Sequence, residues 1–203
     1  SSTSRNTAMG TSLPADPRHE LVIALGDPAG IGMEVTLKAL ASPVIPASLQ
    51  PLLVGCRTSL ISTYNRLQQQ SDAPLVDPRN LRIDDQPLRE PIEPGHPTVA
   101  GASSGFDWLT RAVELLQGRG SRALVTAPIA KHLWHQAGHH YPGQTERLAE
   151  LAGTDRCSMM FTALSPHSGW RLNTLLATTH IPLAEVSAAL SPELIHHKLE
   201  VLL

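Results

Sequence analysis

Apolar and polar positions alternate in blocks along the first two thirds of the chain. A continuous apolar run, typical of a strand covered on both faces of a sheet, occurs at 21–25, and further buried strands are predicted at 51–56 and 122–128. Between them lie segments that predict helices at 33–41, 59–70 and 102–120. Because strand, helix and strand in this order indicate βαβ units and a parallel sheet, we predict an α/β fold.

The rest of the chain continues the mixture of helices and strands. Helices are predicted at 130–137, 145–152, 182–190 and from 192 onward, and strands at 158–164 and 171–180. Ser191 stands directly before Pro192, which is the usual order of an N-cap and the first helical residue. A proline-rich connector at 71–97 contains one short predicted strand at 81–83, and the polar residues 1–19 predict a mobile tail.

Composition sets limits on the class of protein. A chain of 203 residues, 41% hydrophobic and 17% charged, is long enough to bury a core without disulfides. Its net charge of -2 offers no general attraction for nucleic acid or anionic membrane, and no apolar run approaches the roughly 20 residues of a membrane helix. Cys56 and Cys157 lie far apart without CxxC spacing, which is typical of a reducing compartment, so we expect a cytoplasmic protein.

The first candidate site is the glycine-rich turn GDPAGIG, which follows the first predicted strand. Gly26, Gly30 and Gly32 match neither GxGxxG nor GxxxxGK[ST]. Either backbone amides of this turn meet an anion, or the glycines only permit a tight crossing from strand to helix. Asp27 is accordingly a catalytic candidate or a capping residue.

The second candidate site is VTAPIAKHLWHQAGHHYPGQTE, where a predicted strand ends. Lys131 either reaches into the crevice at the carboxyl end of the sheet or is an exposed first-turn residue. The four histidines at 132, 135, 139 and 140 fit surface positions better than a metal site, because no carboxylate is placed to orient their rings. Gln144 and Thr145 offer an amide and a hydroxyl at a helix start, where Thr145 could instead be an ordinary N-cap.

The third candidate is His180, at the end of the predicted strand 171–180 and just before a proline that opens a helix. A lone histidine there is usually structural. The same placement also suits a first metal ligand whose partners come from elsewhere.

Four motifs, in this order and at these separations, resemble the 4-hydroxythreonine-4-phosphate dehydrogenase family. They are GDPAGIGMEV, VTAPIAK, AGHHYPGQTE and LATTHIPL, and the resemblance runs from about residue 21 to residue 203. It implies a three-layer α/β/α protein of two domains, similar in architecture to isocitrate and isopropylmalate dehydrogenases, working as a homodimer. On this basis we assign 20–120 to a first, incomplete α/β domain, and 121–203 to the start of a second α/β domain with the dimerisation region.

The resemblance also implies a reaction and its cofactors. The C3 hydroxyl of a phosphorylated small molecule, 4-phosphooxy-L-threonine, would be oxidised by NAD, and carbon dioxide would be lost to give 3-amino-2-oxopropyl phosphate. A divalent metal (zinc, magnesium or cobalt) would assist. Position by position, His180 matches a metal ligand, Gln144 and Thr145 match the substrate-binding pair, and Asp27 and Lys131 fall in supporting positions. Many members of the family have His-Thr rather than Gln-Thr, and a glutamine cannot supply a cation.

The chain also departs from the family, because its members continue for well over a hundred further residues that bring two more metal histidines and most of the dinucleotide contacts. We therefore expect a truncated form without the C-terminal portion, whose uncovered apolar sheet edge favours association. Two alternatives are a dehydrogenase of a related phosphorylated hydroxy acid, such as 4-phospho-threonate, and a non-catalytic remnant that binds a phosphorylated ligand.

Overall fold

The computed structural model describes residues 21–46, 48–117 and 123–202, which form two compact units. Unit 1 ends at His139 and unit 2 begins at His140. The expected division after residue 120 differs from this boundary, because the next strand pairs with the sheet of unit 1. The tail predicted at 1–19 and the end of the helix predicted at 118–120 lie outside the described residues.

Unit 1 is built on a parallel sheet with the strand order β3-β2-β1-β4. Its strands are β1 (Leu21–Ala24), β2 (Leu52–Gly55), β3 (Arg82–Asp85) and β4 (Ala123–Thr126). The strand predicted at 51–56 is β2, one of the two inner strands, and every residue of β2 is buried. The predicted α/β fold with a parallel sheet is therefore confirmed.

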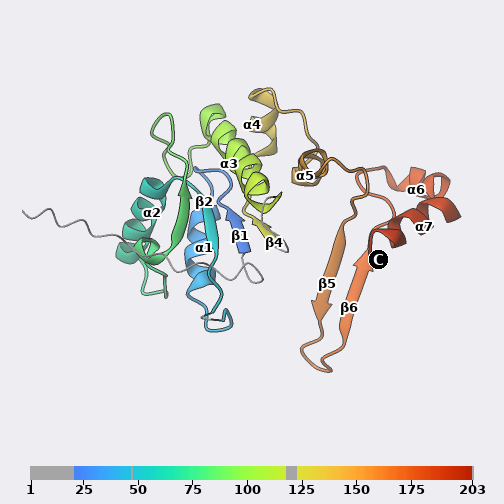
Figure 1. Ribbon diagram of the computed structural model, residues 1–203, viewed down its shortest axis with the longest axis horizontal. Coiled ribbons are helices and arrows are strands. Elements are labelled where there is room, and N and C mark those ends of the chain that lie inside the picture. The colour runs from blue at the N-terminus through green and yellow to red at the C-terminus, as the bar shows by residue number, and fades with distance from the viewer. Residues whose placement is uncertain (1–20, 47, 118–122, 203) are drawn as a thin grey trace, which may run out of the picture. The chain divides into compact units, whose positions relative to one another are not determined.

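Helices connect the strands of unit 1 and cover the sheet. They are α1 (Gly32–Leu40), α2 (Arg57–Gln70) and α3 (Val99–Gln117), with a 3₁₀ turn, η2 (Pro78–Asn80), before β3. The last helix of unit 1, α4 (Lys131–Gln136), follows β4 and contacts α3. Since crossovers between parallel strands are right-handed, the reversal of direction after β3 places α3 on the face opposite α1 and α2. Accordingly α1 contacts α2, α3 packs on β1, β2 and β4, and α2 and α3 lie on opposite sides of the strands (Figure 1).

The core of unit 1 lies between these layers. Val22, Leu53 and Val54 of the sheet have no exposed surface, and neither have Leu37 of α1 and Leu60 of α2. Burying each such side chain stabilises the fold by about 1.5–3 kcal/mol. On the other face, Trp108 and Leu109 of α3 are almost fully buried, so both helical layers contribute to the core.

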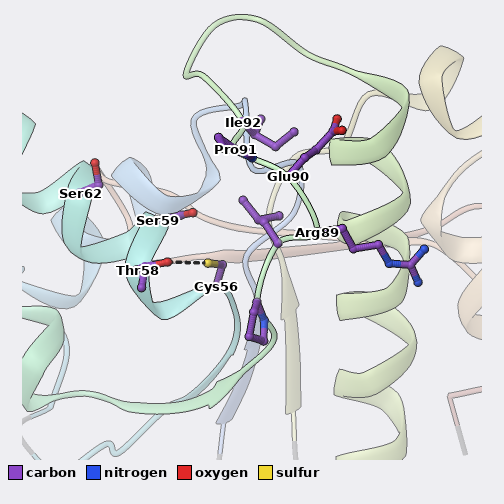
Figure 2. A pocket seen from close by; sticks show the side chains of 10 residues that line it. Cys56, Thr58, Ser59, Ser62, Arg89, Glu90, Pro91 and Ile92 are labelled. Atoms are coloured by element: carbon purple, nitrogen blue, oxygen red, sulfur yellow. Dashed lines mark hydrogen bonds between the residues drawn. The ribbon is translucent and has the colours of Figure 1, made fainter.

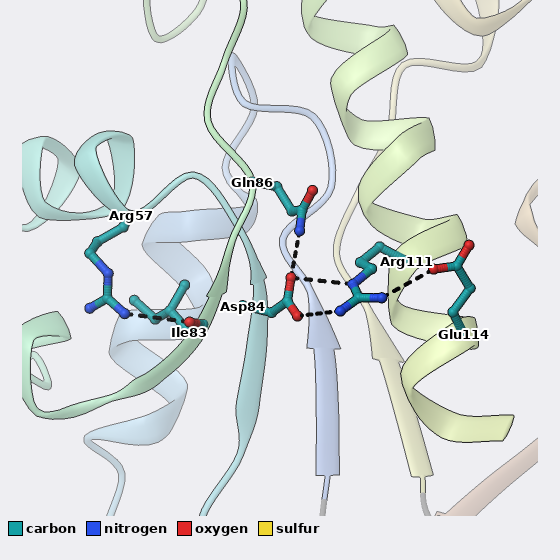
Figure 3. Close-up of polar contacts among 6 residues, drawn as sticks. All are labelled: Arg57, Ile83, Asp84, Gln86, Arg111 and Glu114. Atoms are coloured by element: carbon teal, nitrogen blue, oxygen red, sulfur yellow. Dashed lines mark hydrogen bonds and ion pairs between the residues drawn. The ribbon is translucent and has the colours of Figure 1, made fainter. Parts of the chain in front are cut away.

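A polar contact ties edge strand β3 to α3 (Figure 3). Arg111 of α3 donates from Nη2 to Asp84 Oδ2 (3.0 Å) and from Nε to Asp84 Oδ1 (3.4 Å), while Gln86 also donates to Asp84. Burial opposes ionisation of Asp84, but these hydrogen bonds outweigh burial and lower the pKa of its carboxyl group. The contact between the ionised Asp84 and Arg111 therefore stabilises the packing of α3 against β3.

The opposite edge of the sheet, formed by β4, is less covered. Val125 is 47% exposed and Ala123 is exposed, although three of the four residues of β4 are apolar. Parallel strands are normally buried on both faces. Among the described residues, β4 is therefore an edge strand with exposed apolar side chains.

Unit 2 contains an antiparallel hairpin and three helices, without a core of its own. Its elements are α5 (Gln144–Ala152), β5 (Met160–Leu164), β6 (Arg171–Leu175), α6 (Leu183–Ala189) and α7 (Pro192–Glu200). Among residues 140–202 only Gly143 is buried, and Phe161, Leu164 and Trp170 are each more than half exposed. An isolated two-stranded hairpin is only marginally stable in water and usually needs packing against other elements. The described residues of unit 2 supply little such packing.

Two local predictions have different outcomes in unit 2. Ser191 is the N-cap of α7, since its hydroxyl accepts a hydrogen bond from Leu194 N–H (3.1 Å), as predicted. The strand predicted at 171–180 is too long, because β6 ends at Leu175. Leu176 N–H still donates to Met159 O (2.9 Å), but the paired register of β5 and β6 ends at Leu175.

The contact between Asp84 and Arg111 predicts a pH-dependent stability. We expect Asp84→Asn to lower the free energy of unfolding by about 1 kcal/mol at pH 7, since Arg111 is partly exposed and screened by solvent. Because folding lowers the pKa of Asp84, the contribution is present above its ordinary pKa of about 3.9 and is lost as pH falls through the folded value. Urea unfolding of both proteins between pH 2 and pH 7 measures the difference.

Glu34→Gln is the matched control, because Glu34 forms an exposed ion pair with Lys38 within α1 (2.6 Å). We expect a smaller effect of this substitution at pH 7. An Asp84→Asn effect that stays constant down to the lowest pH would contradict the role given to the ionised contact.

Candidate functional site

The glycine turn after β1 is closed by the segment that follows β4. Asp27 N–H donates to Pro128 O (3.0 Å), and Ala127 N–H donates to Ala24 O (3.0 Å). Gly26 has a φ of +72°, and a Cβ atom added to it would lie 2.3 Å from Pro128 O. Only glycine permits this approach of two backbones.

Two more glycines allow the helices to approach the same turn. A Cβ on Gly32, at the start of α1, would lie 2.3 Å from Leu25 O, and one on Gly105 of α3 would lie 2.9 Å from Gly26 O. In the strand order β3-β2-β1-β4, the connections reverse direction between β1 and β4, where open α/β sheets usually bind ligands. Here backbone contacts fill that place. The geometry therefore supports the interpretation that the glycines permit a tight crossing from strand to helix. It does not support the interpretation that this turn is an open anion-binding site.

Asp27 organises this turn from inside it. Its side chain is 4% exposed, and Oδ1 accepts a hydrogen bond from Ala29 N–H (2.8 Å). Burial raises the pKa of Asp27, and the hydrogen bond from Ala29 and the nearby His132 offset part of that rise. Lys131, the other supporting candidate of unit 1, is the exposed first residue of α4.

The four histidines between residues 132 and 140 take separate positions. His132 and His135 are exposed on α4, and the ring of His139 stacks on Phe106 with centroids 3.6 Å apart and an angle of 5° between the planes. In the described part of the chain, no group of three or more His, Cys, Asp or Glu side chains is placed to hold a metal ion. These residues by themselves therefore do not fit a divalent cation.

Gln144 and Thr145 are the first two residues of α5. The N-cap is Gly143, which is buried and extended and offers no side-chain hydrogen bond, so Thr145 is not the N-cap. The first amides of a helix have no partner within the helix, and the helix dipole favours negative charge there. With a side-chain amide and a hydroxyl at the same end, this arrangement can receive an anionic group.

His180 lies in the turn between β6 and α6. It is five residues beyond the end of β6, so the prediction that it sits at a strand end is wrong. Its φ of 57° lies in the left-handed region, which no other non-glycine residue of the described chain adopts. The side chain is exposed rather than packed inward, so the imidazole is accessible to a ligand.

A pocket that was not predicted from the sequence lies at the carboxyl ends of β2 and β3 (Figure 2). It has a volume of about 440 Å³ and is lined by the start of α2 and by residues 87–92. Cys56 lies in its wall, 3.1 Å from Thr58 Oγ1. Burial opposes ionisation of this thiol, but side-chain hydrogen bonds from Ser59 and Thr58 and backbone hydrogen bonds from Ser59 and Leu88 lower its pKa. Because the tertiary packing of residues 87–92 makes this pocket, no local motif signals it.

No helix in the described part of the chain is both long and apolar enough to cross a membrane.

Comparison with known proteins identifies relatives of the chain. The family model of the pyridoxal phosphate biosynthetic protein PdxA matches residues 40–203. A 4-hydroxythreonine-4-phosphate dehydrogenase of Synechococcus sp. (strain RCC307) is 60% identical over 179 residues, which cover 88% of this chain and 54% of that protein. One from Synechococcus sp. (strain JA-3-3Ab) is 47% identical over 186 residues, or 90% of this chain and 53% of that protein. The chain thus spans about half the length of the curated relatives it matches.

Solved structures of enzymes with the same name are also similar to this chain. A 4-hydroxythreonine-4-phosphate dehydrogenase from Burkholderia phymatum superimposes with a TM-score of 0.72 at 30% identity, over 89% of this chain and 56% of that one. The enzyme from Klebsiella pneumoniae gives a TM-score of 0.71 at 30% identity, over 90% of this chain and 57% of that one.

The contact between the turn at Gly26 and Pro128 predicts a large cost for an added methyl group. We expect Gly26→Ala to lower the free energy of unfolding by about 3 kcal/mol or more, because the clash adds to the strain of a positive φ. The control Gly95→Ala has a φ of +82° but open space around its Cβ, so it carries only the strain, about 1–2 kcal/mol. Equal losses for the two variants in urea unfolding would show that the backbone approach is not tight.

Proposed function

Because the chain belongs to the family of the pyridoxal phosphate biosynthetic protein PdxA, we propose that it serves in the NAD-dependent oxidation and decarboxylation of 4-phosphooxy-L-threonine. The product is 3-amino-2-oxopropyl phosphate, a precursor in cytoplasmic pyridoxal 5'-phosphate biosynthesis, and the working protein is a homodimer. The family match over residues 40–203, which contains the start of α5 and the His180 turn, carries this proposal.

In this proposal Gln144 and Thr145 bind the phosphorylated substrate. Gly143 gives the first turn of α5 no side-chain cap, and the helix dipole there favours an anionic group, to which the Thr145 hydroxyl and the Gln144 amide add directed hydrogen bonds. The binding is local, since the chain as a whole carries a net charge of -2. Asp27 supports the site indirectly by holding the turn after β1, and Lys131 is a supporting cation at the start of α4.

His180 contributes one donor to a divalent metal site, for which zinc, magnesium and cobalt are the candidates. A catalytic ion needs about three protein ligands, and the described residues contain no such group. We therefore propose that the other donors come from protein outside these residues. NAD accepts the hydride. Its pyrophosphate does not use the glycine turn after β1, because Pro128 closes that turn.

Two alternatives follow from particular residues. Gln144 cannot become cationic, which favours a related phosphorylated hydroxy acid, such as 4-phospho-threonate, as the substrate. The lack of a three-donor cluster among the described residues favours a non-catalytic protein that binds a phosphorylated ligand.

A chimera tests the proposal. Residues 21–203 are fused to the part of the Synechococcus RCC307 relative that follows its matched stretch, and NADH formation is measured with 4-phosphooxy-L-threonine, zinc or magnesium, and NAD. We expect turnover, and we expect His180→Ala to lower kcat/KM by at least about 100-fold. The intact relative serves as the positive control.

The matched substitution is His196→Ala, because His196 is an exposed histidine on α7 whose Nε2 lies 3.2 Å from Glu200. It should leave turnover unchanged. Full activity of His180→Ala would refute the role of His180. Turnover of 4-phospho-threonate alone would favour the first alternative, and an inactive chimera beside an active relative would favour the second.

A further inference from the structure

Three side chains of unit 2 join the segment before α5 to the body of that helix. The Tyr141 hydroxyl donates to Glu150 Oε2, and Arg147 Nη1 donates to the same carboxylate oxygen (2.8 Å) and to the Tyr141 oxygen (3.2 Å). The Arg147 guanidinium carbon also lies 5.6 Å from the centre of the Tyr141 ring. We call Tyr141, Arg147 and Glu150 the α5 clamp.

The clamp takes the place of two devices that usually fix a helix start. Gly143 offers no side-chain cap, and no residue of α5 is buried. Many helices join a hydrophobic residue just before the N-cap to one at the fourth helical position. Here Tyr141, two residues before the N-cap, contacts Arg147 at that fourth position through a cation–π contact and hydrogen bonds.

The charges of the clamp suit this role. Hydrogen bonds from Tyr141 and Arg147 lower the pKa of Glu150, so its carboxylate stays an acceptor at neutral pH. The side chain of Arg147 is only 15% exposed, and its charge is directed to Glu150. The clamp therefore joins the segment before α5 to the body of the helix by an ion pair and hydrogen bonds.

We propose that Tyr141 is a positioning residue for Gln144 and Thr145, acting through the α5 clamp. By fixing where the chain enters α5, it sets the direction of the first amides and of the Thr145 hydroxyl, which together receive the phosphate of the substrate. This inference rests on the proposed function of Gln144 and Thr145.

The test measures phosphate affinity at the helix start in the full 203-residue chain. The chain is labelled with ¹⁵N, and the amide shifts of Gln144 and Thr145 are followed while inorganic phosphate is added. Tyr141→Phe keeps the ring but removes the hydroxyl, and we expect it to raise the Kd by about 5- to 10-fold. Glu150→Ala should act alike, whereas Glu150→Gln keeps an acceptor oxygen and should restore most of the affinity.

Tyr64→Phe is the control, because Tyr64 is the other tyrosine of the chain and its hydroxyl accepts a hydrogen bond from Gln68 (2.8 Å) in unit 1. It should leave the Kd unchanged. A Kd in Tyr141→Phe equal to that of the wild type would overturn the role of Tyr141 alone. If phosphate does not shift these amides in the wild type, the substrate site at α5 fails, and the role of Tyr141 fails with it.

Discussion

The approach of two backbone segments, the turn at Gly26 and the chain at Pro128, governs the organisation of unit 1. It joins the carboxyl ends of β1 and β4 by direct hydrogen bonds, and it brings α1 and α3 against the same turn through Gly32 and Gly105. The place where the connections of an open sheet reverse is therefore filled with protein. The candidate substrate-binding and metal-binding residues lie elsewhere, at the start of α5 and in the exposed turn at His180.

The sequence predicted those parts of the fold that depend on local pattern. Apolar segments marked β1, β2 and β4 of unit 1, and Ser191 before Pro192 marked a helix start. It could not decide whether Thr145 was an ordinary N-cap, because a threonine at a helix start satisfies that rule, whereas the backbone makes Gly143 the N-cap of α5. Nor did apolar composition show that β6 ends at Leu175, since strand length depends on a pairing partner.

In the candidate site, too, the features that depend on local pattern were predicted and those that depend on packing were not. Gln144 and Thr145 were identified as a helix start, and the structure shows that start without a side-chain cap. The clamp of Tyr141, Arg147 and Glu150 was not predicted, since three polar residues at these spacings are common on exposed helices. Unit 2 buries almost none of its apolar side chains, so it displays candidate site residues without enclosing them.

The central claim is that this chain supplies part of a site, with His180 as one metal donor among several. Zinc content after dialysis tests it most directly, by comparing the 203-residue chain with the chimera that carries the remainder of the Synechococcus relative. The account predicts about one zinc ion per chimera, a loss of most of it in His180→Ala, and no stoichiometric zinc in the chain alone. One tightly held zinc ion in the 203-residue chain, or an unchanged content in the His180→Ala chimera, would contradict it.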